Sequence, residues 1–291
     1  TGKLIEGMEI KGTLGKLYAK ADRIDLGKEI ARLNKIDISD TAITLLMNDT
    51  TTNKDTTSTA VNWILALDQI DLSRVAFAIQ IPDDSLRLST YIGKAGLADG
   101  IADLGSARYS ASRFLLSESS LSYDGGNSDP TPRFDPTHIA LSDVNIQIDS
   151  LLYGDRNIHA RLKEFSAHDR SGLTISSLTG NISCDSAMIQ VPELLLQTPY
   201  SEIRLLATVP WSSFDDTPSG TLRTLLTATV GKEDVFLFAD PLPQEFKQAY
   251  PQKDISLTAG VEGNLAALRL RQLKGRLPGV FDLNITGEIK N

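Results

Sequence analysis

At 291 residues the chain is long enough to form one large domain or two. Its 37 acidic and 29 basic residues give a net charge of -8 without long blocks of one sign, which argues against a nucleic-acid partner. The single cysteine, Cys184, excludes an intramolecular disulfide and a cysteine-based metal site, and we expect an inert, partly buried thiol.

The first ambiguous segment is LGKEIARL at 26–33, which fits either a helical turn or a loop between strands. Beyond it, apolar and polar residues alternate almost throughout. A period of two is typical of mostly antiparallel strands with one apolar face. The alternating segments include 36–45, 70–79, 86–92, 114–123, 139–152, 158–165, 173–182, 203–209, 222–230, 255–261 and 281–289.

Clusters of turn-forming residues separate these strands, at 48–59, 124–136, 167–172 and 215–220. We expect the two longest, 48–59 and 124–136, to be flexible loops. One segment differs: DPLPQEFKQAYP at 240–251 places Leu242, Phe246 and Tyr250 on one helical face between prolines, which predicts a short helix.

A ten-residue pattern recurs along the strands, written apolar-x-apolar-Ser-x-x-x-apolar-x-apolar. Four segments match it strictly: IDISDTAITL (36–45), IDLSRVAFAI (70–79), FLLSESSLSY (114–123) and IALSDVNIQI (139–148). A fifth copy, beginning at Leu173, fails at Gly180. Copies one and two, and copies four and five, are each 34 residues apart, which favours a fixed structural unit with variable loops.

The two apolar pairs of this pattern stand at odd and even positions, so a regular strand would send them to opposite faces. A β-bulge near the serine would return both pairs to one face and bend the strand. We therefore predict an all-β fold: an elongated, curved, mostly antiparallel sheet of repeated bulged strands, folded into a groove, with one or two short helices. We expect one continuous repeat-built domain over 1–291, with a possible subdivision at the loop 124–137.

Residues suited to catalysis or metal binding do not cluster in the sequence. His138, His159 and His168 lack the spacing of metal ligands, so we interpret them as structural. The loop DGGNSDPTPRFD does not match a calcium-binding loop, and YIGKAG lacks the remaining residues of a phosphate-binding loop. We predict no catalytic residues, no metal site, no cofactor and no enzymatic activity.

The run AGLADGIADLGSARYSASRFLLSESSLSYDGG at 95–126 and the segment from FDPTHIAL to IRLLA at 134–207 resemble a known family. Together with AGVEGNLAALRL at 259–270, they resemble the repeat region of the AsmA-like superfamily, and within it the TamB-type translocation and assembly module proteins of the Bacteroides group. The similarity covers about residues 30 to 290 and rests on the succession of strands and turns.

This resemblance implies an envelope protein that spans the periplasm as an elongated β-taco, carries an inner-membrane anchor and works with an outer-membrane barrel of the assembly type. The family is thought to conduct phospholipid or to assist outer-membrane protein assembly. The chain has no apolar run of 18 residues, no export signal and no initiator methionine, so we expect a piece of a periplasmic protein whose anchor lies outside this sequence.

The first hypothesis for function is that the apolar repeat positions line a groove that shields or conducts the acyl chains of a phospholipid or a similar ligand. Two alternatives remain open: a scaffold that pairs strands with outer-membrane proteins during assembly, and a secreted glycan-binding β-solenoid with aromatic platforms on its outer face. A purely structural spacer is the remaining possibility. The groove candidates are Ile36, Ile38, Ile43, Ile70, Leu72, Phe77, Leu116, Leu121, Ile139, Leu141, Ile146 and Ile148.

Overall fold

The structure is a computed structural model, and it describes residues 2–5, 8–47, 62–82, 84–126, 128–154, 157–238 and 243–290. The predicted flexible loop at 48–59 therefore lies outside the described residues. The chain forms two compact units: unit 1 comprises residues 1–155 with 166–172, and unit 2 comprises 156–165 with 173–291. The division falls beside residue 156, whereas the loop 124–137 lies within unit 1.

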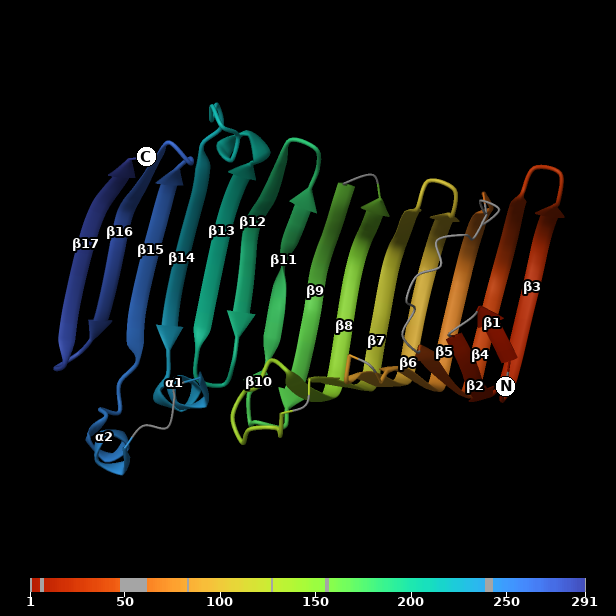
Figure 1. Cartoon of the computed structure of the whole chain (residues 1–291), viewed down its shortest axis with the longest axis horizontal. Coiled ribbons are helices and arrows are strands. Elements are labelled where there is room, and N and C mark those ends of the chain that lie inside the picture. Colours follow the sequence, from red (N-terminus) through yellow and green to blue (C-terminus); the bar gives the residue numbers. More distant parts are fainter. Residues whose placement is uncertain are drawn as a thin grey trace. The chain divides into compact units, whose positions relative to one another are not determined.

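Unit 1 is a sheet of long strands (Figure 1). From β1 to β8 the described strand pairs are antiparallel except β4 with β5, which is parallel. β2 and β3 both pair with β4, and from β4 to β8 each strand pairs with the next. The strands are β1 (Gly2–Ile5), β2 (Met8–Thr13), β3 (Lys16–Asp25), β4 (Ile30–Met47), β5 (Ile64–Ile81), β6 (Leu86–Asp103), β7 (Arg108–Gly125), β8 (His138–Gly154) and the C-terminal part of β9 (Asn157–Asp169).

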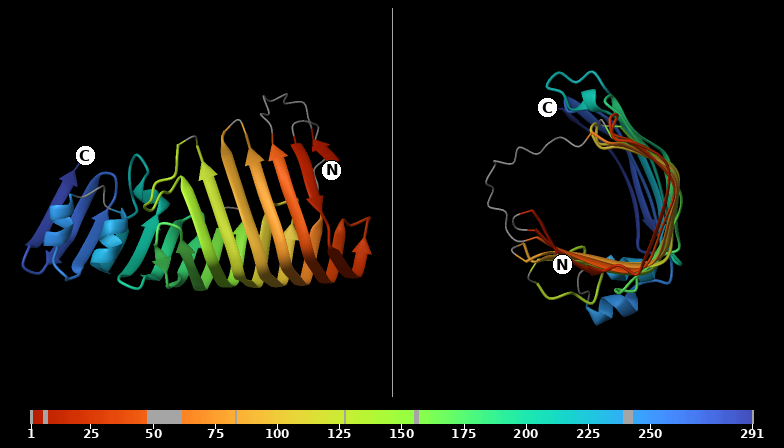
Figure 2. Two further views of the ribbon diagram at one scale, coloured as in Figure 1. Left: turned by 90° about the horizontal axis from the view of Figure 1, so that it is seen from below. Right: turned by 90° about the vertical axis from the view of Figure 1, so that its right-hand side faces the viewer.

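The long strands of unit 1 bend along their length, so an end-on view shows them curving rather than running straight (Figure 2). Strands β4 to β7 each have 18 residues and β8 has 17, which is about three times the usual strand length. Each therefore has one arm before the bend and one arm after it.

Unit 2 contains the N-terminal part of β9 and shorter strands. β9 pairs with β11, and from β11 to β17 each strand pairs antiparallel with the next. A 3-10 helix, η1 (Trp211–Ser213), follows β13. The remaining strands are β10 (Thr174–Ile175), β11 (Ser177–Cys184), β12 (Met188–Gln197), β13 (Glu202–Pro210), β14 (Leu222–Val230), β15 (Ile255–Gly263), β16 (Ala267–Leu277) and β17 (Phe281–Lys290).

The two α-helices of unit 2 are short: α1 (Lys232–Phe238) and α2 (Gln244–Ala249). α2 confirms the helix predicted within 240–251, although Leu242 lies outside the described residues. α1 was not predicted. Its buried Asp234 accepts hydrogen bonds from the hydroxyls of Thr198 and Ser201, both at 2.5 Å, which ties the helix to the turn after β12.

The ambiguous segment 26–33 contains no helix. Residues 26–29 form a turn, and β4 begins at Ile30. The prediction of an all-β fold built from a curved, mostly antiparallel sheet with one or two short helices is confirmed, and the structure has two short α-helices.

The described residues bury few large side chains, because the fold does not stack a second layer on the sheet of unit 1. Alanine and valine dominate the buried apolar set, and most of the larger apolar side chains stay half-buried. The buried apolar residues are Ala31, Val75, Ala111, Val144, Ala167, Val191, Ala228, Tyr250 and Leu277.

Candidate functional surface

In each repeat strand, the bend occurs at the residue that directly follows the serine of the ten-residue pattern. This residue has a left-handed backbone in all four strict copies, and such a conformation is uncommon for residues other than glycine. The φ values are 53° for Asp40, 53° for Arg74, 54° for Glu118 and 50° for Asp143. The change of alternation predicted near the serine is therefore present, as a left-handed residue directly after the serine in each copy.

At the bend, the register of strand pairing is continuous in one pair of strands and shifted in another. Between β4 and β5 the partners advance together, from Ser39 with Ser73 to Thr41 with Val75. Between β7 and β8 the register shifts on both sides of Ser119, as in a β-bulge. The bend thus depends on the left-handed residue in every copy, and an extra unpaired residue appears only in some strand pairs.

A single left-handed residue reverses the alternation of side chains, so the residues two before it and one after it point to the same side. A second bend, in β6, shows this directly, because Asp99 has a φ of 49° and a Cβ on Gly100 would lie 2.5 Å from the Leu97 side chain. By the same geometry, Ile38, Thr41 and Ile43 share one side of β4. Both apolar pairs of each repeat therefore face the same way.

This shared side is the inside of the bend. The residue after each left-handed position is buried although unit 1 has no covering layer among its described residues, which places its side chain between the two arms. The exposed fractions are 4% for Thr41, 7% for Val75, 3% for Ser119 and 4% for Val144. We call the side that carries these residues and the apolar repeat pairs the inner face.

Hydroxyl groups at two of these buried positions complete the backbone hydrogen bonding at the bend. Thr41 Oγ1 donates to the Ser39 carbonyl at 3.0 Å and accepts from the Gly15 amide at 3.3 Å. Ser119 Oγ likewise donates to the Ser117 carbonyl at 2.9 Å and accepts from the Gly93 amide at 3.2 Å. The bend consequently leaves these backbone groups satisfied.

The apolar repeat residues of different strands align in continuous rows across unit 1, because the pairing register brings equivalent positions opposite one another. Before the bend, the rows are Ile36–Ile70–Leu97–Phe114–Ile148 and Ile38–Leu72–Ala95–Leu116–Ile146. After the bend, they are Ile43–Phe77–Thr90–Leu121–Leu141 and Leu45–Ile79–Leu88–Tyr123–Ile139.

All twelve predicted groove residues belong to these rows, so the structure brings them together on the inner face. Ile43 is 37% exposed, and the other eleven are half-buried. Sequence reasoning missed the contribution of β6, which supplies one residue to every row but lacks the serine pattern. Its alternating segment LRLSTYI was the available signal.

The opposite side of the sheet, the outer face, is polar where these rows are apolar. Asp37 and Asp71 lie opposite each other on β4 and β5, and the Lys35 ammonium lies 3.2 Å from the first carboxylate and 3.7 Å from the second. The hydrogen bond and charge of Asp37 raise the pKa of Lys35 above its ordinary value. The positive charge of Lys35 thus reduces the electrostatic repulsion between the two facing carboxylates.

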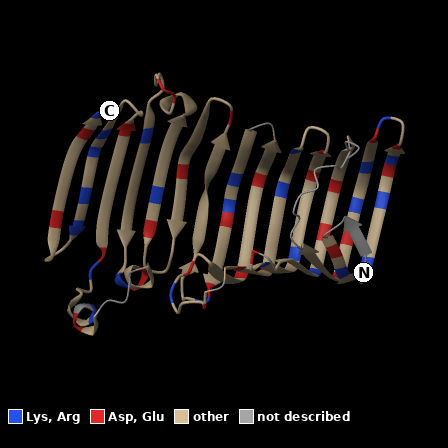
Figure 3. Cartoon of the chain, in the orientation of Figure 1, with Lys and Arg blue, Asp and Glu red and all other residues tan. Residues whose placement is uncertain are grey.

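Charged side chains also stand at the left-handed positions, on the outside of the bend. The Arg74 guanidinium forms two hydrogen bonds with the Asp40 carboxylate, at 2.6 and 2.9 Å, and these hold the pKa of Asp40 below its usual value. Lys94 and Glu118 pair at 2.5 Å. Figure 3 shows acidic and basic residues interspersed along the strands of unit 1, without a large patch of one sign.

The histidines lie apart from one another. His138 is 4% exposed, and its Nδ1 lies 3.2 Å from the carboxylate of Asp135. His168 lies 3.6 Å from Asp143, and His159 lies in the N-terminal part of β9. Among the described residues, no group of three or more histidine, cysteine, aspartate or glutamate side chains could hold a metal ion.

In the part of the chain that the structure describes, no helix is both long and apolar enough to span a bilayer. No protein-family model, no curated protein and no solved structure matches the chain.

Proposed function

We propose that the chain is a non-enzymatic segment of a periplasmic envelope protein, similar to the TamB-type modules, and that its inner face shields or conducts the acyl chains of a phospholipid or similar ligand. In this proposal the parent protein is anchored in the inner membrane by a segment outside this sequence and works with an outer-membrane barrel of the assembly type. One observation carries it: aligned apolar rows that stay half-exposed.

The uncovered inner face supports this proposal. No described helix or second sheet of unit 1 covers the apolar rows. Large uncovered apolar surfaces on soluble proteins are usually binding surfaces.

The energetics favour an acyl chain as the occupant. Burial of a lipid tail contributes about 0.8 kcal/mol per methylene, so even part of one chain laid along a row would be held. The rows provide apolar contacts without charged groups among their members. A ligand with a long unbranched tail therefore matches the inner face better than a compact polar one.

Native mass spectrometry of the chain purified from cells, followed by crosslinking with a photoreactive phospholipid, tests the proposal. We expect a bound phospholipid mass and crosslinks at inner-face residues such as Leu72 and Leu116. A chain that carries no lipid and crosslinks only at random surface positions would contradict it.

A second candidate function is pairing with an extended segment of another protein, as in barrel assembly, and the last strand of unit 2 favours it. All ten residues of β17 are exposed, and it pairs with β16. Its Phe281, Leu283 and Ile285 side chains are 43%, 41% and 42% exposed. Among the described strands of unit 2, β17 is paired with β16 alone, so its other edge can accept another strand.

For this second function, a labelled peptide with the sequence of β16 (267–277) provides a direct probe, because β16 is the natural neighbour of β17. We expect the peptide to bind, as measured by fluorescence anisotropy, and Ile285→Lys to weaken binding. Leu17→Lys in β3, at a residue that is 56% exposed in unit 1, serves as the control. Equal binding of a scrambled peptide would exclude specific pairing at β17.

A further inference from the structure

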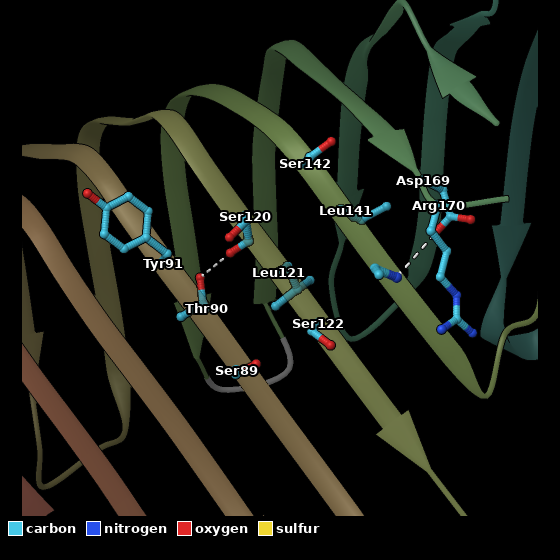
Figure 4. Close-up of a pocket in the computed structure, with 11 residues that line it drawn as sticks. Ser89, Thr90, Tyr91, Ser120, Leu121, Ser122, Leu141, Ser142, Asp169 and Arg170 are labelled. Atoms are coloured by element: carbon cyan, nitrogen blue, oxygen red, sulfur yellow. Dashed lines mark hydrogen bonds between the residues drawn. The ribbon is translucent and has the colours of Figure 1, made fainter. Parts of the chain in front are cut away.

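The outer face of unit 1 carries a hollow that the acyl-chain proposal does not use. Its volume is about 490 Å³, and it lies over three neighbouring strands, β6, β7 and β8, beside the end of β9 (Figure 4). Three consecutive residues from each strand line it, together with two from β9 and the turn after it. The lining residues are Ser89, Thr90, Tyr91, Ser120, Leu121, Ser122, Ala140, Leu141, Ser142, Asp169 and Arg170.

Most of the side chains that frame the hollow lie on the face opposite to the repeat leucines. Ser89, Ser122 and Ala140 form one row across the strands, and Tyr91 and Ser120 belong to the next. These rows flank the positions of Leu121 and Leu141, and successive side chains of a strand project to opposite faces. A ligand in the hollow would therefore not compete with an acyl chain on the inner face.

The hollow offers hydroxyl groups that the protein itself leaves available. Thr90 Oγ1 donates to the Ser120 carbonyl at 2.8 Å, but the hydroxyls of Ser89, Ser120 and Ser122 have no side-chain hydrogen bond to any other described residue. Each can donate one hydrogen bond and accept others. Three such groups on two adjacent strands form a polar floor suited to a ligand with many hydroxyls.

The two ends of the hollow differ in chemistry. Tyr91 lies at one end with 44% of its surface exposed, so its ring can stack against a flat apolar face (Figure 4). Arg170 is exposed at the other end, and its guanidinium has no ion pair with the described residues. The neighbouring Asp169 carboxylate already accepts from the amides of Ala140, at 3.2 Å, and Ser171, at 2.9 Å.

We propose that this hollow binds an acidic oligosaccharide, with one sugar ring on Tyr91, hydroxyls on the serine rows and a carboxylate on Arg170. The strand spacing places the two ends about 14 Å apart, since three steps of about 4.8 Å separate Tyr91 from Arg170. A single sugar ring cannot span that distance, so the ligand is an oligosaccharide. The volume of the hollow falls within the usual range for ligand sites, about 300–1,000 Å³.

The site binds the saccharide without cleaving it. Glycosidic hydrolysis needs two carboxyl groups on opposite sides of the bond, and Asp169 is the only carboxylate among the lining residues. Both of its oxygens are already engaged by backbone amides. Nucleic acid does not fit either, because Arg170 is the only basic residue in the lining and the chain has a net charge of -8.

Isothermal titration of the whole chain with trigalacturonate, and separately with maltotriose as the neutral counterpart, tests the assignment. We expect trigalacturonate to bind more tightly than maltotriose. Tyr91→Ala should weaken both by about tenfold, because a stacking contact of about 1.4 kcal/mol is lost. Arg170→Gln should weaken only trigalacturonate, because it removes the charge that pairs with the carboxylate.

Tyr109→Ala is the matched control, since Tyr109 is 40% exposed in the same unit and stacks on Tyr153 outside the hollow. It should leave both affinities unchanged, and circular dichroism verifies that each variant is folded. The assignment is overturned if neither saccharide binds, if Tyr91→Ala and Tyr109→Ala behave alike, or if Arg170→Gln changes both affinities equally. Leu116→Glu, on the inner face, should not affect saccharide binding, which separates this test from that of the acyl-chain proposal.

Discussion

At the scale of single residues, the shape of unit 1 depends on the left-handed residue that follows the serine in each repeat copy. Asp40, Arg74, Glu118 and Asp143 all adopt a conformation that costs about 1–2 kcal/mol for an L-residue. The neighbouring contacts must offset this cost in each strand. In β4 and β7 those contacts include the Thr41 or Ser119 hydroxyl that completes the backbone hydrogen bonding, and in β7 they include the close approach of β6.

Gly93 makes that close approach, opposite the left-handed Glu118. A Cβ at Gly93 would collide with the Glu118 carbonyl oxygen, whereas a Cβ at Gly96 on the same strand would find its nearest atom at 3.8 Å. We expect Gly93→Ala to lower the free energy of unfolding by about 1–3 kcal/mol. Gly96→Ala should change it by less than about 1 kcal/mol. Urea unfolding of the two variants measures the difference, and equal effects would show that the bend does not need close contact at Gly93.

Asp135 provides a prediction for pH dependence. Hydrogen bonds from the Thr137 hydroxyl, from the amides of Thr131 and Thr137 and from His138 hold its pKa well below the ordinary 3.8. A lowered folded-state pKa stabilises the fold above the unfolded-state pKa, and this contribution is lost as the pH falls from about 3.8 through the folded-state pKa.

We therefore expect wild type to be more stable than Asp135→Asn at neutral pH, and the difference to shrink once the pH falls below 3.8. Urea midpoints of both proteins across this range measure it. Asp129→Asn, in the same loop, is the control and should show no such trend. A difference between wild type and Asp135→Asn that stays constant with pH would show that the hydrogen bonds do not depend on the charge of Asp135.

At the scale of elements, the repeat pattern predicted the position of the bend in β4, β5, β7 and β8, but not the bend in β6. It could not predict which strands are neighbours. Copies one and two, 34 residues apart, lie side by side as the parallel pair β4 and β5, with Ser39 opposite Ser73. Copies four and five have the same separation, but they belong to different units, and the fifth is interrupted at Ser176 between β10 and β11.

Other elements could not be predicted from the sequence, for physical reasons. β6 has no serine pattern because, opposite the left-handed Glu118 of β7, it carries Gly93 and not a left-handed residue, so only its alternation marked it as a strand. α1 is seven residues long, too short for an apolar periodicity, and depends on the tertiary contacts of Asp234. The hollow on the outer face brings together residues 89 to 170, and only the strand order places them side by side.

At the scale of the whole molecule, the two units have different architectures. The long bent strands and the aligned inner-face rows belong to unit 1, whereas unit 2 has shorter strands and both α-helices. Composition and alternation were sufficient to predict the fold class, because a period of two specifies strands. They were insufficient to predict the division beside residue 156, which depends on how many contacts each strand makes with distant segments.

The most direct test of the acyl-chain proposal uses two adjacent residues of β7. Leu116 lies on the inner face in the row with Leu72 and Ile146, and Leu115, 41% exposed, lies on the outer face opposite Gln147. The measurement is the crosslinking of a photoreactive phospholipid to wild type, to Leu116→Glu and to Leu115→Glu. The account predicts that Leu116→Glu loses most of the crosslinked lipid while Leu115→Glu retains it. Equal retention by both folded variants would contradict the account.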